Sequence, residues 1–383
     1  MAKNLSLAKD FSNRLEEKEF DHEGVGHIKM HSVSPNDSKE AVMLKKFYDK
    51  NYRPNYILGN PKLFNWQFQH NDKKVAALSL NGEIIAHQGY VPVVFSDGET
   101  DYKGFISAST MVDVDFRRKG LMTVLRSTVQ DDYETAVSLG GSKQGVALYT
   151  SMGYRHYGDL IRLVAIVDPA KCDGIAQRPD KLKQTVTLAR EDDSSIRPIK
   201  RFSEISDQLE TLRNKILPPK TSFGVKRNAE FLDWRYTDHP IFDYQHYGLW
   251  QGNELKAITI FRKEKISEKS IPVIRMTELI GEGQDLRKLV QGSVLSQENS
   301  GDVAWIDWFC SHAKICEDLK PLGFLEPKDI LPSVLPIFTK PVDYYKVSYP
   351  FLFWAKDEEL HKQMPTIDKW YITKGDGDAD RPN

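Results

Sequence analysis

The period of the apolar residues changes in the middle of the N-terminal half of the chain. Over residues 106–115 apolar and polar positions alternate, which predicts a β-strand. Over residues 121–133 apolar residues recur every three or four positions, with Arg126 on the polar side, which predicts an amphipathic helix. Between them lies the short basic turn 116–120. The sequence therefore predicts a strand that leads through a basic turn directly into a helix.

The same reasoning gives an order of elements for residues 25–168. Asn81-Gly82 between two apolar runs predicts a two-residue hairpin, and a second hairpin leads into the strand before the basic turn. Residues 1–24 are polar, with Leu7, Phe11 and Leu15 spaced as in one short amphipathic helix. The expected order is strand 26–30, helix 37–48, strands in 75–80, 83–87, 90–95 and from 102, helix 121–133, strand 135–139, helix 142–152 and a last strand 160–167.

The basic turn has the properties of an anion site. The start of a helix has backbone N–H groups without partners and carries the positive end of the helix dipole. Gly120 allows close approach to the backbone, and Arg117, Arg118 and Lys119 add positive charge. The turn therefore predicts a binding site for a pyrophosphate.

Two segments resemble the GNAT superfamily of N-acetyltransferases. Residues 117–122 resemble its coenzyme A signature, Arg/Gln-x-x-Gly-x-Gly/Ala, except that Met122 replaces the last small residue. Residues 142–154 resemble its Asn-x-x-Ala-x-x-Leu-Tyr-x-x-x-Gly-Phe segment, with Ser142 in place of Asn as a helix cap. The resemblance implies acetyl-CoA, or another acyl-CoA, as co-substrate, with Tyr149 facing its sulfur. It implies that the coenzyme is bound by Val112, Val114, Arg117, Arg118, Lys119, Gly120, Leu121, Met122, Thr123 and Ser142.

The second half of the chain repeats features of the first. Trp66 and Trp234 lie in similar segments 168 residues apart, and Gly153 and Gly323 lie in similar segments 170 residues apart. Such spacing predicts tandem copies of one domain. Around residues 278–285 acidic residues replace the arginines of the basic turn, which predicts a degenerate second copy.

The expected fold class is therefore α+β, with two tandem GNAT-like domains. Each would be a mixed, mainly antiparallel twisted sheet flanked by helices. The expected boundaries are an N-terminal extension 1–24, a catalytic domain 25–168, a linker 169–195, a degenerate domain 196–356 and a C-terminal tail 357–383, for which disorder is expected.

Composition excludes several classes of function. A formal net charge of −1 argues against nucleic acid as a partner. No apolar stretch is long enough to span a bilayer, the first residues do not resemble a signal peptide, and three cysteines are too few for a disulfide scaffold. We therefore expect a cytoplasmic protein. Cys310, His312 and Cys316 lack a fourth ligand at a usual spacing, so we expect no metal. The oligomeric state stays open.

The chemistry expected is direct transfer of an acyl group to a primary amine. Tyr149 would protonate the leaving thiolate, because a phenol carries its proton at neutral pH. His87 and Asp113 are the two candidate bases, and an amine that arrives neutral needs neither. Trp234, Arg235 and His239 are candidates for acceptor binding.

A closer resemblance, to two-domain acetyltransferases of bacterial surface-polysaccharide gene clusters, implies an amino sugar as acceptor, with a nucleotide-linked form as the narrower hypothesis. Two alternatives stay open. One is an aminoacyl transferase resembling the Fem family, and the other is an acyl-CoA-binding module without turnover.

Overall fold

The computed structural model describes residues 17–68, 75–130, 132–190, 193–330, 335–339, 342–345, 348–364 and 366–380. The chain forms two compact units. Unit 1 comprises residues 1–95, 100–156 and 351–363, and unit 2 comprises residues 96–99, 157–350 and 364–383. Unlike the expected domains, each unit is made of segments that are not consecutive in the sequence. Among the described residues, no helix has both the length and the apolar composition that crossing a bilayer requires.

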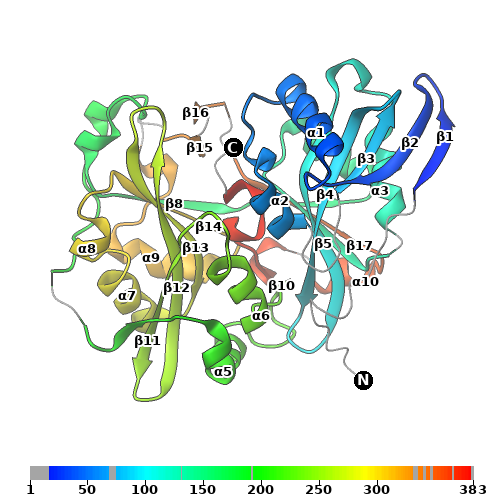
Figure 1. Cartoon of the computed structure of the whole chain (residues 1–383). Helices are drawn as coiled ribbons and strands as arrows, with labels where there is room; N and C mark the ends of the chain where they lie inside the picture. The colour runs from blue at the N-terminus through cyan, green and yellow to red at the C-terminus, as the bar shows by residue number, and fades with distance from the viewer. Residues whose placement is uncertain are drawn as a thin grey trace. The chain divides into compact units, whose positions relative to one another are not determined.

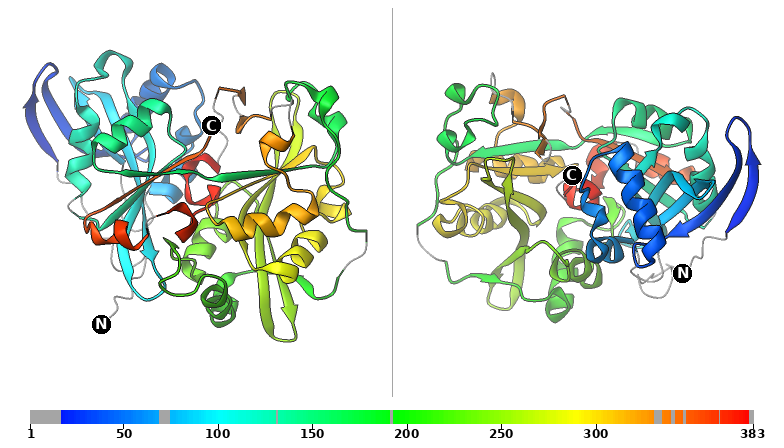
Figure 2. Two further views of the ribbon diagram at one scale, coloured as in Figure 1. Left: turned by 180° about the vertical axis from the view of Figure 1, so that it is seen from behind. Right: turned by 45° about the horizontal axis from the view of Figure 1, so that its top comes forward.

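Unit 1 is built on one mixed sheet with helices on both faces (Figure 1). Its strands follow the order β1-β2-β3-β4-β5-β6-β17, and β5 and β6 run parallel while β6 and β17 run antiparallel. Helices α1 and α3 cover opposite faces of this sheet, as Figures 1 and 2 show from the two sides. The strands are β1 Lys18–His22, β2 Gly26–Val33, β3 Val75–Leu80, β4 Glu83–Ser96, β5 Asp101–Val112, β6 Thr135–Leu139 and β17 Pro350–Ala355, and the helices are α1 Ser38–Asn51, α2 Pro61–Phe68, α3 Leu121–Gln130, α4 Lys143–Ser151 and α10 Glu359–Gln363.

Unit 2 is built on a second mixed sheet, in the order β8-β14-β13-β12-β11-β9. Its strands are β8 Ile161–Ile166, β9 Ile196–Pro198, β11 Gln245–Gln251, β12 Glu254–Ile266, β13 Ile271–Ile280 and β14 Trp305–Cys310. Its helices are α5 Ser206–Ile216, α6 Ala229–Leu232, α7 Gly283–Gly292, α8 Gln297–Ser300 and α9 Ala313–Leu319, with a π-helix at Asp233–Thr237. Short strands β10 Phe223–Val225 and β18 Trp370–Tyr371 pair in parallel, β15 Phe338–Thr339 pairs with β16 Val342–Asp343, and β7 Arg155–Asp159 spans the boundary between the units.

The two units repeat one order of elements, which confirms the predicted α+β class with tandem GNAT-like domains. In each, a long hairpin leads through a helix into a strand parallel to the second arm of the hairpin, which is β5 with β6 in unit 1 and β13 with β14 in unit 2. The helix after that strand is α4 in one unit and α9 in the other, and each precedes a glycine with positive φ, Gly153 at +86° and Gly323 at +90°. A positive φ favours glycine, so the two similar segments share a helix stop.

The predicted strand at 160–167 is present, and its partner in the sheet lies in unit 2. This segment forms β8, but β8 pairs with β14 of unit 2 and not with β6. The position beside β6 is taken by β17, with Phe353 opposite Val137. Both β8 and β17 are nearly continuous apolar runs with buried side chains. Such a run indicates a buried strand but does not specify its neighbour. For that reason the sequence did not reveal that β17, and not β8, pairs with β6.

The ends of the chain also differ from the expectation. Leu7, Phe11 and Leu15 lie outside the described residues, and residues 18–22 form strand β1. The predicted disorder of the tail was wrong for residues 370–380. Trp370 is fully buried, and Lys374 has an exposed fraction of only 4%. By contrast, the Asn81-Gly82 hairpin is confirmed, with both residues at positive φ.

Candidate active site

The predicted basic turn lies on the surface and ends at the first turn of α3. Arg118, Lys119 and Gly120 are exposed, while Leu121 and Met122 at the start of α3 are buried. The N–H groups of Thr123 and Val124 donate to the carbonyl of Gly120. The N–H groups of earlier residues have no carbonyl one turn back to bind, so they point out of the helix end. The turn therefore offers backbone donors and positive charge on one exposed surface.

The backbone of this turn is held in an unusual shape. Arg118 has φ +65° and Gly120 has φ +74°, both in the left-handed region. For arginine this conformation costs free energy, about 1–2 kcal/mol. A non-glycine residue held there in an exposed loop is often functional, because it keeps successive N–H groups turned to one side.

Asp113 is engaged in holding the turn. Its carboxylate accepts from the N–H of Asp115 at 3.0 Å and pairs with Lys50 at 2.9 Å. Asn51 donates to the same carboxylate at 3.2 Å and accepts from the N–H of Val114 at 2.9 Å. Although burial raises the pKa of Asp113, the hydrogen bonds from Lys50 and Asp115 hold it below its usual value. A carboxylate with a lowered pKa is a weaker proton acceptor, so these contacts favour a structural role.

Strands β5 and β6 separate next to the turn. Their parallel pairing runs from Gly104 opposite Thr135 to Ile106 opposite Val137, and β5 then continues to Val112. The part of β5 beyond this pairing includes Ser109, whose φ of +50° lies in the left-handed region. The registered pairing with β6 therefore ends before the part of β5 that leads into the basic turn.

Tyr149 of α4 contacts β5 beyond its pairing with β6. Its hydroxyl lies 2.9 Å from the hydroxyl of Thr110, and its ring contacts that of Tyr154 at 4.9 Å between centroids. Ser142 caps α4, as predicted, by accepting from the N–H of Gly145 at 3.1 Å. The structure therefore brings the predicted acid and the predicted anion site to the same end of β5.

His87 lies on the other face of the sheet. Its side chain is fully buried, and its ring contacts the rings of Phe47 and Tyr48 of α1 at 5.2 and 5.3 Å. Three residues along the same strand, Tyr90 donates to the carbonyl of Leu125 in α3, which covers the opposite face. His87 therefore has no exposed surface through which an acceptor amine could reach its ring.

Arg126 is a residue whose position the sequence reasoning missed. It was expected on the polar side of α3, but its exposed fraction is 1%. Its guanidinium lies over the rings of Phe105, Tyr154 and Trp354. A signal was present in the sequence, since Arg126 follows Met122 and precedes Val129 at the three- and four-residue spacing of an apolar stripe.

Among the solved structures with a similar fold are proteins named as N-acyltransferases. No protein-family model matches the sequence, and no curated protein matches it either. Saccharomyces cerevisiae N-myristoyltransferase with bound myristoyl-CoA and inhibitors is similar at a TM-score of 0.59 and 12% identity, over 92% of this chain and 84% of that one. A GCN5-related N-acetyltransferase from Anabaena variabilis gives 0.54 at 10% identity, over 86% and 73% of the two chains.

The chain has the tandem GNAT fold. A probable N-acyltransferase from Enterococcus faecalis is similar at a TM-score of 0.50 and 10% identity, over 74% of this chain and 65% of that one. At these identities the likeness concerns the fold, so activity has to be argued from the residues of the site.

In the second copy of this fold, the start of the helix after the hairpin is already bound to an acidic side chain. Asp318 of α9 accepts from the N–H of Gly283 at 2.7 Å, at the start of α7, and pairs with Arg287 at 3.0 Å. Glu282 lies beside it and pairs with Lys314. A carboxylate of the chain thus takes the position at which unit 1 presents a basic turn, and it would repel a phosphate.

Of the three predicted acceptor residues of unit 2, Trp234 and Arg235 are buried and His239 is half-buried. Trp234 and Arg235 belong to the π-helix Asp233–Thr237, and both are buried. The guanidinium of Arg235 donates to the carbonyl of Gly375 at 2.9 Å. Burial, helped by the charge of Arg235, lowers the pKa of His239 to about 3. Its Nδ1 accepts from the N–H of Phe242 at 3.0 Å, so these side chains have partners within the fold.

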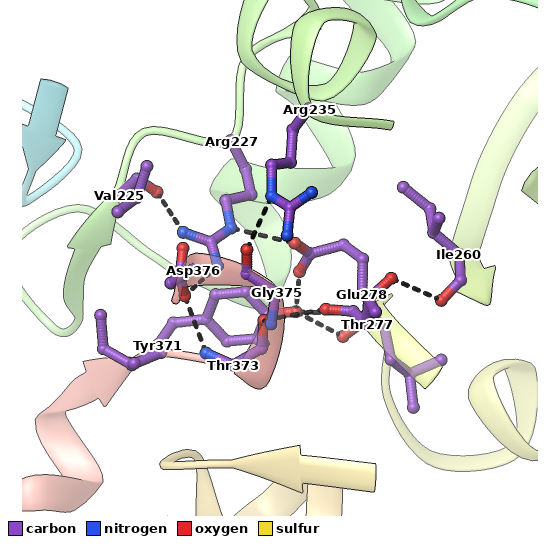
Figure 3. Close-up of polar contacts among 12 residues, drawn as sticks. Val225, Arg227, Arg235, Ile260, Thr277, Glu278, Tyr371, Thr373, Gly375 and Asp376 are labelled. Atoms are coloured by element: carbon purple, nitrogen blue, oxygen red, sulfur yellow. Dashed lines mark hydrogen bonds and ion pairs between the residues drawn. The ribbon is translucent and has the colours of Figure 1, made fainter. Parts of the chain in front are cut away.

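A buried ionic network occupies the same unit (Figure 3). Arg227 pairs with Glu278 at 3.1 Å and with Asp376 at 2.6 Å, and Tyr371 donates to Glu278. Asp376 also accepts from the N–H of Thr373 at 2.8 Å. The network binds the C-terminal segment to β13, which explains why a polar tail is ordered there.

Proposed function

We propose that the chain is an acyl-CoA-dependent N-acyltransferase whose active site is the end of β5 in unit 1. The observation that carries the proposal is the joint position of the exposed basic turn and Tyr149 at the end of β5, beyond its pairing with β6. The turn would bind the pyrophosphate of coenzyme A through its N–H groups and through Arg117, Arg118 and Lys119. The similar structures include a complex with myristoyl-CoA, which supports an acyl-CoA as donor.

The proposed reaction needs little from the chain beyond placement and one proton. A neutral primary amine attacks the thioester carbonyl, the new C–N bond forms, and the C–S bond breaks. Backbone N–H groups of β5 beyond its pairing with β6 would stabilise the charge on the carbonyl oxygen, an effect of about 3 kcal/mol per donor. The Tyr149 hydroxyl would give its proton to the thiolate and regain one from the amine through water. Given the burial of His87 and the ion pair of Asp113, we assign no dedicated base.

The narrower proposal is acetyl transfer to an amino sugar, with a nucleotide-linked sugar as the first acceptor to test. This rests on the resemblance to acetyltransferases of surface-polysaccharide gene clusters. The N-myristoyltransferase likeness makes longer acyl groups a necessary part of the same screen.

Tyr149→Phe tests the proposal directly. It removes only the hydroxyl that contacts Thr110, so the variant should bind acyl-CoA as the wild type does and lose turnover by about 10²–10⁴-fold. Binding is measured as the rise in melting temperature with acyl-CoA, and turnover as thiol release over a panel of amines. Thr150→Ala, on an exposed position of the same helix, is the matched control. No rise in melting temperature for the wild type would refute the binding site. Binding without thiol release would favour a non-catalytic module.

A further inference from the structure

Arg126 is buried among aromatic rings in the interior of unit 1. Its guanidinium carbon lies 4.3 Å from the ring centroid of Phe105, 4.6 Å from that of Tyr154 and 5.7 Å from that of Trp354. Phe105 and Trp354 both lie opposite Ala136 in neighbouring strands. The side chain between these two large ones is thus a single methyl group.

Within the described part of the chain, none of the three guanidinium nitrogens of Arg126 makes a hydrogen bond. No carboxylate of the described residues forms an ion pair with it either. The buried arginines of unit 2 are different, since Arg227 binds two carboxylates and a carbonyl. Arg126 therefore has aromatic rings around its guanidinium but no carboxylate of the described residues beside it.

The energies show that the rings alone leave Arg126 unsatisfied. A cation over an aromatic ring gains about 0.5–2 kcal/mol. An arginine has five N–H donors, and each buried donor without a partner costs about 1–3 kcal/mol. Removing the charge from water costs several kcal/mol more. A planar anion that accepts two parallel hydrogen bonds would offset most of this cost, and a carboxylate has that geometry.

The position of Arg126 relates it to the proposed reaction. It lies five residues after Leu121, about 7.5 Å along α3 from the basic turn, and helical side chains lean toward the N-terminus. Its guanidinium is 4.6 Å from the ring of Tyr154, and that ring is 4.9 Å from the ring of Tyr149. The guanidinium therefore lies at most about 9.5 Å from the ring of the proposed acid, the sum of those two distances.

We propose that Arg126 binds a carboxylate at the far end of the acyl group, so that the donor is the coenzyme A thioester of a dicarboxylic acid. The inference rests on the proposed function and deepens it. The thioester would lie at Tyr149, and the chain of the acyl group would run along the aromatic rings to Arg126. In this arrangement the guanidinium selects the acyl group and takes no part in bond making.

The test compares matched donors on the full-length protein. Dissociation constants are measured for succinyl-, glutaryl- and adipoyl-CoA, each against the monocarboxylic acyl-CoA of equal carbon number, and for free coenzyme A. For at least one length the dicarboxylic donor should bind the wild type tighter by at least about tenfold, since hydrogen bonds to charged groups are strong in a buried site. Arg126→Met should lose or reverse this preference and bind free coenzyme A as the wild type does. Arg178→Met, an exposed arginine of unit 2, should change neither value.

Three results would refute either the role of Arg126 or the proposed function. Equal or weaker binding of the dicarboxylic donor at every length in the wild type overturns the inference, and this result does not depend on whether the variant folds. A preference that persists in Arg126→Met also overturns it. If free coenzyme A fails to bind the wild type, the proposed function itself is refuted, which distinguishes its failure from that of the inference.

Discussion

Lys374 provides a sharp test of the electrostatics of unit 2. It lies in the short 3₁₀ helix Lys374–Asp376 and has an exposed fraction of 4%. Its ammonium lies 4.7 Å from the ring centroid of Phe309. Burial, with help from the charge of Arg275, lowers the pKa of Lys374 to about 7, although Asp307 opposes this. We predict that Lys374→Met stabilises the protein at neutral pH.

The direction of this stability change follows from how many protons Lys374 binds in the folded and the unfolded state. Between the folded pKa of about 7 and the unfolded value of 10.5, the unfolded chain holds a proton at Lys374 that the folded chain lacks. Stability therefore rises with pH through this window, and the cost of burying the amine is greatest below it. At about 1.4 kcal/mol per pH unit the cost is roughly 4 kcal/mol at pH 7 and about 1 kcal/mol at pH 10. Replacing a buried ion by an apolar side chain of similar size typically gains about 1–4 kcal/mol.

The assay is urea unfolding followed by tryptophan fluorescence. Trp305 and Trp308 of β14 are fully buried and report on unit 2. Lys374→Met should raise the unfolding free energy at pH 7 by about 1–4 kcal/mol, and its advantage should shrink toward pH 10. Lys369→Met, at an exposed lysine of the same unit, should show neither effect. If Lys374→Met is less stable than the wild type at pH 7, the amine is charged and held by Asp307 and Asp380, and the argument fails. It also fails if the stability difference between the two proteins is the same at pH 7 and pH 10.

Two further predictions use the same unfolding assay. Asp376→Asn removes the carboxylate that binds Arg227 and the N–H of Thr373, so it should cost about 3–5 kcal/mol, and a cost below about 1 kcal/mol would show that the network in Figure 3 contributes little. Asp318→Ala removes the acceptor at the start of α7 and should cost about 0.5–2 kcal/mol, with Asp329→Ala as a control; equal stability of the two variants would contradict a capping role.

Local structure could be predicted where one short segment determines it. The Asn81-Gly82 turn, the change from strand to helix at Gly120 and the Ser142 cap each follow from residues within a few positions of one another. The tandem organisation was also visible, because two copies at one offset carry the same information twice. These features depend on local conformation and periodicity, which a sequence displays directly.

The missed features all depend on partners distant in the chain. Asp376 looks like a residue of a solvated tail, yet Arg227 binds it from 149 residues away. Arg126 looks like a surface residue of α3 until Trp354 of β17 is brought to its side by pairing with β6. A sequence analysis places charged residues on the surface by default. Only the folded structure shows which of them are buried beside a partner of opposite charge or among aromatic rings.

The C-terminal segment explains why the second copy of the fold would not be expected to bind a coenzyme. Strands β13 and β14 pair in parallel only at Ile274–Ile306 and Arg275–Asp307, as β5 and β6 pair only at their start. In unit 2 the residues beyond this point bind the chain's own tail. Thr373 donates to the carbonyl of Thr277 at 2.8 Å, and Ile372 accepts from the N–H of Ser311 at 2.9 Å. The tail thus binds backbone groups of β13 and of the residue after β14, at the end of the sheet that corresponds to the proposed coenzyme site of unit 1.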